Sequence, residues 1–143
     1  MVKVTRKGFT LVEILIVVVI LGILAAIVVP QFTNATQDSQ AGNIRAQLKS
    51  LQNQIELAKA RATDGQYPDL LGSRGWGVMI DPNNDGTLED GYIKAAPKNP
   101  FNNSTDVVGT AAAGKGWTYD RTTGTLGACY FDETNDKLTP TTP

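Results

Sequence analysis

An apolar run of 21 residues, Phe9–Val29, most constrains how this chain can fold. Its only ionisable side chain is Glu13, and its only helix-weakening residue is Gly22. At a rise of about 1.5 Å per residue, a helix over this run would be about 31 Å long, which is close to the thickness of the hydrocarbon core of a bilayer. A helix of a soluble domain rarely stays apolar on every side over such a length. The run therefore predicts a membrane-spanning helix.

The charges that flank this run predict its orientation. Lys3, Arg6 and Lys7 precede it, with no acidic residue among them. Such a bias holds the N-terminus in the cytoplasm and sends the rest of the chain across the membrane in a single pass. Without these three cations the chain has 10 basic and 14 acidic residues, a formal charge of −4. A mildly acidic exported part argues against nucleic acid as a partner.

The composition also argues against an enzyme. The chain has no histidine, which removes the commonest general base and the commonest zinc ligand. Its one cysteine, Cys129, cannot close an intramolecular disulfide. Serine, aspartate and lysine are present, but no pattern assembles them into a catalytic site, and we expect no catalytic residue.

The junction ahead of the run has a specific pattern. Gly8 is followed by Phe9 and Thr10, and Glu13 is the fifth residue after Gly8. Read on their own, Gly8 is a flexible residue and Thr10 a helix N-cap. Together with the basic leader and with Pro30, the pattern resembles the class III signal of type IV pilins and type II secretion pseudopilins. The match covers roughly residues 6–32.

The resemblance implies that this segment is processed. A prepilin peptidase would cut between Gly8 and Phe9, remove the leader (residues 1–8) and methylate the new amine of Phe9. Glu13 would then act in filament assembly, by pairing with the amine of Phe9 on a neighbouring subunit and so setting the axial register. A carboxylate inside a membrane helix usually has such a partner. The alternative is that Glu13 reaches the headgroups or favours the positive end of the helix dipole.

The helix is expected to continue beyond the membrane. Pro30 would kink it rather than end it. The residues that follow carry one apolar stripe at helical spacing, which predicts an amphipathic helix that ends near Asp64-Gly65. The stripe consists of Ile44, Leu48, Leu51, Ile55, Ala58 and Ala62.

The remainder favours short strands. Residues 76–80 and 91–94 are candidate extended pieces, and residues 116–131 predict an antiparallel hairpin around the turn Arg121–Gly124. Trp117, Tyr119, Leu126 and Tyr130 are expected to be core and cross-strand residues, and the polar tail from Thr134 to Pro143 to be frayed.

These elements predict an α+β fold of the pilin type, with a long N-terminal helix packed on a small antiparallel β-sheet head. The expected division of the chain is a cleaved leader (1–8), a transmembrane and filament-core helix (9–29), its amphipathic continuation (30–63) and a β-rich head (64–143).

The head resembles the G-type major pseudopilins more loosely. Two segments look like motifs of that group, although Phe101 stands where a tryptophan is usual. They are Gly65-Gln66-Tyr67-Pro68 and the segment from Tyr92-Ile93 through Pro97 to Asn102. G-type pseudopilins hold a calcium ion near the C-terminus, but no matching acidic loop is evident there. Type IV pilin, G-type pseudopilin and minor pilus subunit all remain open.

One candidate calcium site lies elsewhere, in the stretch from Asp81 to Asp90. It has oxygen ligands at its first, third and fifth places and glycine at its sixth, like the first half of an EF-hand loop, but its twelfth place is Tyr92. A solvated turn has the same composition. The candidate ligands are Asp81, Asn83, Asp85, Thr87 and Asp90.

Two classes of function are compatible with these features. The resemblance implies a structural subunit of a type II secretion pseudopilus or of a type IV pilus. Such a subunit is stored in the bacterial inner membrane with its head in the periplasm. It then joins a helical homo-oligomer with the help of the prepilin peptidase, other pilins or pseudopilins and an inner-membrane assembly platform. The second class is a single-pass anchored periplasmic module that binds calcium or a small ligand and never polymerises.

Overall fold

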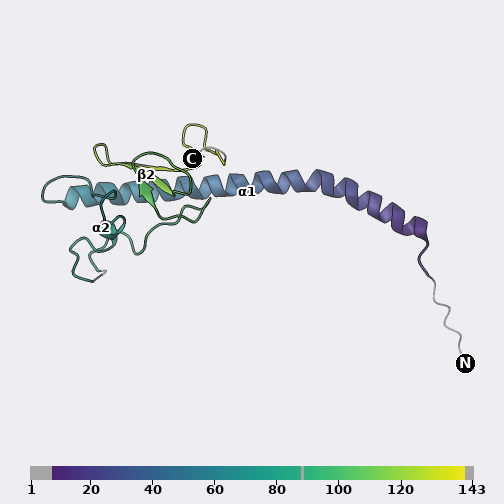
Figure 1. Cartoon of the computed structure of the whole chain (residues 1–143), viewed down its shortest axis with the longest axis horizontal. Helices are drawn as coiled ribbons and strands as arrows, with labels where there is room; N and C mark the ends of the chain where they lie inside the picture. Colours follow the sequence, from purple (N-terminus) through teal and green to yellow (C-terminus); the bar gives the residue numbers. More distant parts are fainter. Residues whose placement is uncertain (1–7, 88, 141–143) are drawn as a thin grey trace, which may run out of the picture. The chain divides into compact units, whose positions relative to one another are not determined.

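The structure is a computed structural model that describes residues 8–87 and 89–140. The predicted leader lies outside these residues except for Gly8. The elements are a long helix α1 (Leu11–Arg61), a short helix α2 (Gly77–Ile80) and five short strands, β1 (Val107–Val108), β2 (Trp117–Asp120), β3 (Thr125–Ala128), β4 (Phe131–Asp132) and β5 (Lys137–Leu138) (Figure 1). The chain divides into two compact units, Met1–Thr36 and Gln37–Pro143.

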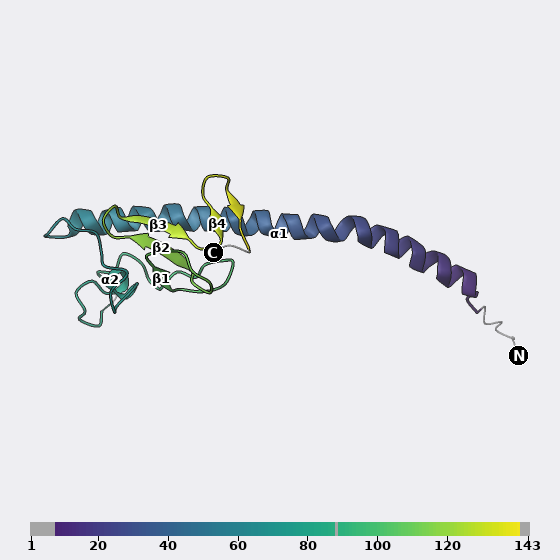
Figure 2. The same ribbon diagram turned by 45° about the horizontal axis from the view of Figure 1, so that its top comes forward.

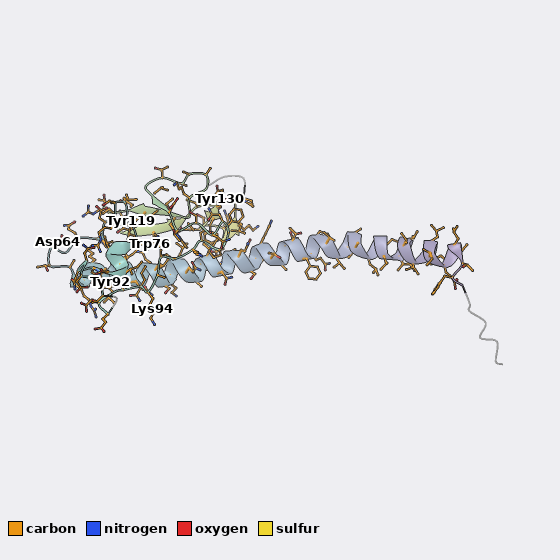
Figure 3. All side chains as sticks on the ribbon, turned by 60° about the horizontal axis from the view of Figure 1, so that its bottom comes forward. Asp64, Trp76, Tyr92, Lys94, Tyr119 and Tyr130 are labelled. Atoms are coloured by element: carbon orange, nitrogen blue, oxygen red, sulfur yellow. The ribbon has the colours of Figure 1, made fainter. Side chains whose placement is uncertain are left out.

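The first unit is the N-terminal part of α1, and its apolar side chains are exposed. Phe9 is 83% exposed, and the large apolar residues from there to Phe32 are all at least 40% exposed. Figure 3 shows these side chains projecting from the helix on different sides. Among the described residues, α1 is the one helix that is long and apolar enough to cross a membrane. Pro30 lies inside α1, which confirms that the helix continues through it.

The second unit packs the rest of α1 against the head, as the sequence predicts. Within the predicted stripe, Ile44, Leu51, Ile55 and Ala58 are buried, while Leu48 is partly buried against the same core. The strands of the head run alongside this part of the helix (Figure 2). The helix ends at Arg61, and Gly65 follows in the left-handed region with φ +64°, as the Asp64-Gly65 signal predicts.

The predicted hairpin is confirmed as β2 and β3. Trp117 is paired with Ala128, and Tyr119 with Leu126, around the turn Arg121–Gly124. These four paired residues are all buried, because they lie on the face of the sheet that packs on the core. The second strand ends at Ala128, earlier than predicted. Tyr130, which has φ +64° and lies after it, is only partly buried.

Two parts of the sheet differ from the sequence prediction. Val107–Val108 pairs in parallel with β2, so the sheet is mixed rather than purely antiparallel. The predicted frayed tail is wrong for residues 137–138, because β5 pairs with β4 in a second, two-stranded hairpin. A strand of only two residues, Lys137 and the partly buried Leu138, is too short to show a period that sequence reading could detect. Residues 141–143 lie outside the described part of the chain.

The two candidate extended pieces are also wrong. Residues 77–80 form α2, and residues 91–94 form bends rather than a strand. The backbone N–H groups of Tyr92 and Ile93 both donate to the carbonyl of Met79, at 2.8 and 3.2 Å. This cross-connection fixes the two segments against each other. An apolar run of four residues is compatible with either helix or strand, since length and period do not separate them.

A clamp joins α1, the segment after it and the β2–β3 turn. The Tyr67 hydroxyl donates to Glu56, and the ammonium of Lys59 lies 4.0 Å from the centre of the Tyr67 ring. Gln52 donates to the carbonyl of Gly124 at 2.9 Å and accepts from the N–H of Leu126 at 3.0 Å. Through these hydrogen bonds and the cation–π contact, the clamp holds the helix against the turn that joins β2 and β3.

The clamp leads to a testable prediction at Gly124. This residue has φ +72°, and a Cβ there would overlap the ring of Tyr67. Gly124→Ala is expected to destabilise the head by about 3–4 kcal/mol, from left-handed strain together with overpacking. Gly114→Ala is the matched control, because Gly114 has φ +76° but open space around it. That control is expected to lose only about 1–2 kcal/mol in urea unfolding. Equal losses for the two variants would contradict the role of the Tyr67 contact.

Candidate functional site: the start of the apolar helix

The predicted cleavage junction lies just ahead of α1. Gly8 and Phe9 have no regular secondary structure and are exposed, and α1 begins two residues later at Leu11. A peptidase needs an extended and accessible backbone at the bond that it cuts, because helical backbone is folded into its own hydrogen bonds. The residues on each side of this bond are exposed and lie outside the helix, which is compatible with cleavage there.

Thr10 and Glu13 form a reciprocal cap at the start of α1. The N–H and the hydroxyl of Thr10 donate to Glu13 Oε2, at 2.8 and 2.9 Å. The N–H of Glu13 donates in return to the hydroxyl of Thr10 at 3.2 Å. This is a capping box, in which two otherwise unpaired N–H groups of the first turn are satisfied. Sequence reading identified Thr10 as the N-cap but missed the box, although the spacing Thr-x-x-Glu is its signal.

The box holds the Glu13 carboxylate at the N-terminal end of an apolar helix. Among the described residues, no cationic side chain pairs with it, and its neighbours along α1 are exposed apolar groups. A carboxylate accepts up to about four hydrogen bonds, so the contacts with Thr10 leave capacity for a further donor. The site can therefore bind an ammonium group that approaches this end of the helix.

The candidate calcium ligands are organised mainly by contacts within their own loop. The Asp81 carboxylate accepts from the N–H groups of Asp85 and Gly86, and Asp85 accepts from the N–H and hydroxyl of Thr87. The bonds from Thr87 hold the pKa of Asp85 below its usual value. Asn83 donates to Asp90 at 3.0 Å. Gly86 has φ +83°, which fits its predicted place in the sharp turn.

The acidic members of this donor set do not gather into one cluster. Within the described ranges, no three histidine, cysteine, aspartate or glutamate side chains come close enough to share an ion. Calcium binding by this loop stays a prediction. A calcium titration of the thermal midpoint after chelation tests it, since an ion that binds only the native state must raise that midpoint.

Comparisons with known proteins match both parts of the chain. Residues 4–29 match the family model described as the prokaryotic N-terminal methylation motif. The type II secretion system core protein G of Vibrio cholerae is 33% identical over 102 residues, which cover 68% of this chain and 67% of that protein. The same-named protein of Pseudomonas aeruginosa is 32% identical over 103 residues, which cover 68% of this chain and 70% of that protein.

The chain belongs to the core protein G family of type II secretion systems. The resemblance found at its N-terminus is thereby confirmed. A fimbrial protein of Pseudomonas aeruginosa is also similar, with 35% identity over 100 residues that cover 59% of this chain and 65% of that protein. These core G relatives match a larger share of the chain than the fimbrial relative does. No solved structure matches the chain.

In this core G protein, the segment from Pro97 to Asn102 organises the head. Asn99 is fully buried and donates to the carbonyls of Gly116 and Cys129, at 2.6 and 3.2 Å. Its own side-chain oxygen accepts from the N–H of Phe101 at 2.8 Å. All three bonds of the side chain therefore go to backbone groups. Two of them join this segment to the residue before β2 and to the residue after β3, and the third lies within the segment. Sequence reading found the motif but not the role of its asparagine.

Proposed function

We propose that this protein is a structural subunit of a type II secretion pseudopilus, assembled from the inner membrane into a helical filament that helps to drive protein export. The observation that carries the proposal is the combination of a prepilin methylation motif, an exposed apolar helix and a head that is related to core G proteins. This family is structural and not enzymatic, in agreement with the expected absence of catalytic residues.

In this proposal the N-terminal segment is processed before assembly. A prepilin peptidase removes residues 1–8 and methylates the amine of Phe9. The exposed, non-helical junction at Gly8 and Phe9 supports this step. The orientation follows from the leader cations, with the N-terminus in the cytoplasm and the head in the periplasm. Other pseudopilins and an inner-membrane platform are the expected partners.

Assembly then replaces lipid by neighbouring helices. The exposed apolar side chains of residues 9–29 exchange one apolar environment for another, so the gain comes from packing and from polar pairing rather than from removal of water. Glu13 supplies the polar pair, with the Phe9 amine of a neighbouring subunit as its partner. Because every subunit repeats the same pairing, this contact sets the register of the filament.

The proposal can be tested in cells from which the gene for this chain is deleted. The wild-type chain or a Gly8 variant is then supplied in trans. Deletion is expected to abolish secretion through the type II system, and the wild-type chain to restore it with a methylated Phe9 as its first residue. Gly8→Leu is expected to remain unprocessed and inactive, whereas Gly8→Ala keeps a small residue at the bond and is processed. Mass spectrometry of the N-terminus measures both the removal of the leader and the methylation of Phe9. An intact leader on a chain that restores secretion would contradict the proposal.

The second candidate is a subunit of a type IV pilus, which the fimbrial relatives favour. The same deletion experiment distinguishes a pilus subunit from a pseudopilus subunit. Loss of surface fibres with normal secretion is the result expected for a pilus subunit, and loss of secretion is the result expected for a pseudopilus subunit. A periplasmic binding module that never polymerises would keep its leader.

A further inference from the structure

The head has a groove that none of its own side chains fills. The groove lies between residues 70–77 and β1 and has a volume of about 430 Å³. Leu70 and Trp76 line it but are almost fully buried, and the indole N–H of Trp76 is bonded to the carbonyl of Thr105. Leu71 borders the groove and is 45% exposed, more than any other large apolar side chain of the described head. The groove thus combines apolar side chains with a larger share of polar lining, and no part of the described chain occupies it.

The groove also runs along the open edge of the three-stranded sheet. The outer edge of β3 is covered, because Gln52 of α1 bonds to both Gly124 and Leu126. On the opposite side, β1 pairs only with β2, and no other strand of the described chain lies beyond it. Its backbone is short, but it can bond a segment that enters the groove.

The rim of the groove is positively charged. Arg74 donates to the carbonyls of Gly77 and Asp81, and no carboxylate of the described residues is paired with it. Lys115 lies across the groove, where its charge is balanced by Asp106 at 2.8 Å. The net charge of the rim therefore favours an acidic partner.

The same chain has an acidic surface that could meet this rim. Its stretch from Asp81 to Asp90 contains four acidic residues and no basic one. Asp85, Glu89 and Asp90 are exposed there, and we call these three residues the acidic loop. Within one subunit, Arg74 contacts the backbone next to this loop and not its carboxylates. The acidic loop and the groove are thus two different and complementary surfaces of one chain.

We propose that the groove receives the acidic loop of a neighbouring copy in the filament. A contact between two different surfaces of identical subunits is heterologous, and its repetition generates a helical array. The exposed side chain of Leu71 contributes apolar burial at this contact, and Arg74 contributes charge pairing. The inference rests on the proposed filament function, and it identifies which surfaces of the head meet.

Disulfide cross-linking in assembled filaments tests this contact. Two copies with different tags are produced together, one carrying Leu71→Cys and the other Glu89→Cys, while the buried Cys129 is left in place. A dimer that carries both tags is expected after oxidation. Leu57→Cys paired with Glu89→Cys is the control, because Leu57 is 39% exposed on α1 and does not border the groove. Filaments that form without a doubly tagged dimer, or with as much dimer in the control, overturn the inference.

Charge reversal at Arg74 gives a second, independent measurement. Arg74→Glu is expected to lower the yield of sheared filaments roughly tenfold or more, because like charges then face each other, whereas Arg74→Lys keeps most of the yield. The thermal midpoint of the head is measured for both variants, to separate folding from assembly. An unchanged yield for Arg74→Glu overturns the inference. If the wild-type chain forms no filaments at all, it is the proposed function that fails.

Discussion

Replacing Asn99 by alanine is expected to destabilise the head by about 3–5 kcal/mol, the largest loss that we expect from a single side chain. Asn99 is fully buried, and it serves the carbonyls of Gly116 and Cys129 and the N–H of Phe101. Truncation leaves all three backbone groups without this partner, in a place that water does not reach. In a unit of this size the unfolding midpoint should fall by roughly 15 °C.

The two tryptophans make this loss measurable in the full-length protein in detergent. Trp76 and Trp117 are the only tryptophans of the chain, and both are buried in the head. Their fluorescence during urea unfolding therefore reports the head alone. Asn53→Ala is the control, because Asn53 is exposed on α1 and should change stability by no more than about 0.5 kcal/mol. Similar losses for the two variants would contradict the role of Asn99.

Asn99→Asp is expected to make the stability of the head depend on pH. A carboxylate at this position would face two carbonyl oxygens, so only its protonated form could donate to either of them. Burial and this contact raise the pKa of the introduced carboxyl in the folded state above its value in the unfolded chain. The folded state then binds the proton more tightly, so this variant should lose stability as pH rises through the folded pKa and recover as pH falls. The wild-type head should not show this pH dependence, because the side chain of Asn99 does not titrate.

The parts of the fold that sequence reading predicted have strong local periods. The stripe from Ile44 to Ala58 repeats at helical spacing, and the buried pairs of β2 and β3 alternate with period two around a turn that ends in Gly124. The parts that it missed depend on partners distant in the sequence. The pairing of Val107 with Trp117 and the bonds from Tyr92 to Met79 have no signal within their own segments.

For the candidate site, the structure adds the local geometry that the sequence motif lacks. The sequence motif predicts functions for Gly8, Phe9 and Glu13, because their spacing resembles the signal that a prepilin peptidase recognises, and these functions stay predictions. The motif could not show that Glu13 is bonded to Thr10, since the same residue pattern permits a side chain that reaches toward solvent or headgroups. Only the start of α1, with the donors of Thr10 at 2.8 and 2.9 Å from Oε2, distinguishes these conformations.

The bond to Thr10 gives Glu13 a role as a helix cap, and the proposed pairing with Phe9 of a neighbour would give it a second role. Two variants should separate these roles. Glu13→Gln keeps an acceptor for Thr10 but removes the charge, whereas Thr10→Val removes the hydroxyl of the capping box and keeps the charge. We expect Glu13→Gln to lower filament yield about a hundredfold, since loss of a charge pair in an apolar environment is worth about 3 kcal/mol. Thr10→Val should lower it no more than about fivefold, the typical value of a cap.

Immunoblots of sheared filaments and of alkali-washed membranes measure assembly and insertion separately for each variant. Both variants should remain in the membrane, because an apolar helix of this length does not need Glu13 to insert. If Thr10→Val loses assembly and Glu13→Gln does not, then Glu13 acts as a helix cap and the register role is wrong. The expected result, a larger loss of filament yield for Glu13→Gln than for Thr10→Val, requires the two roles of Glu13 to be compatible. They are, because one carboxylate can accept from Thr10 of its own chain and from the amine of a neighbour at the same time. The capping box then orients the carboxylate before the neighbour arrives, and the amine meets an acceptor that is already in place.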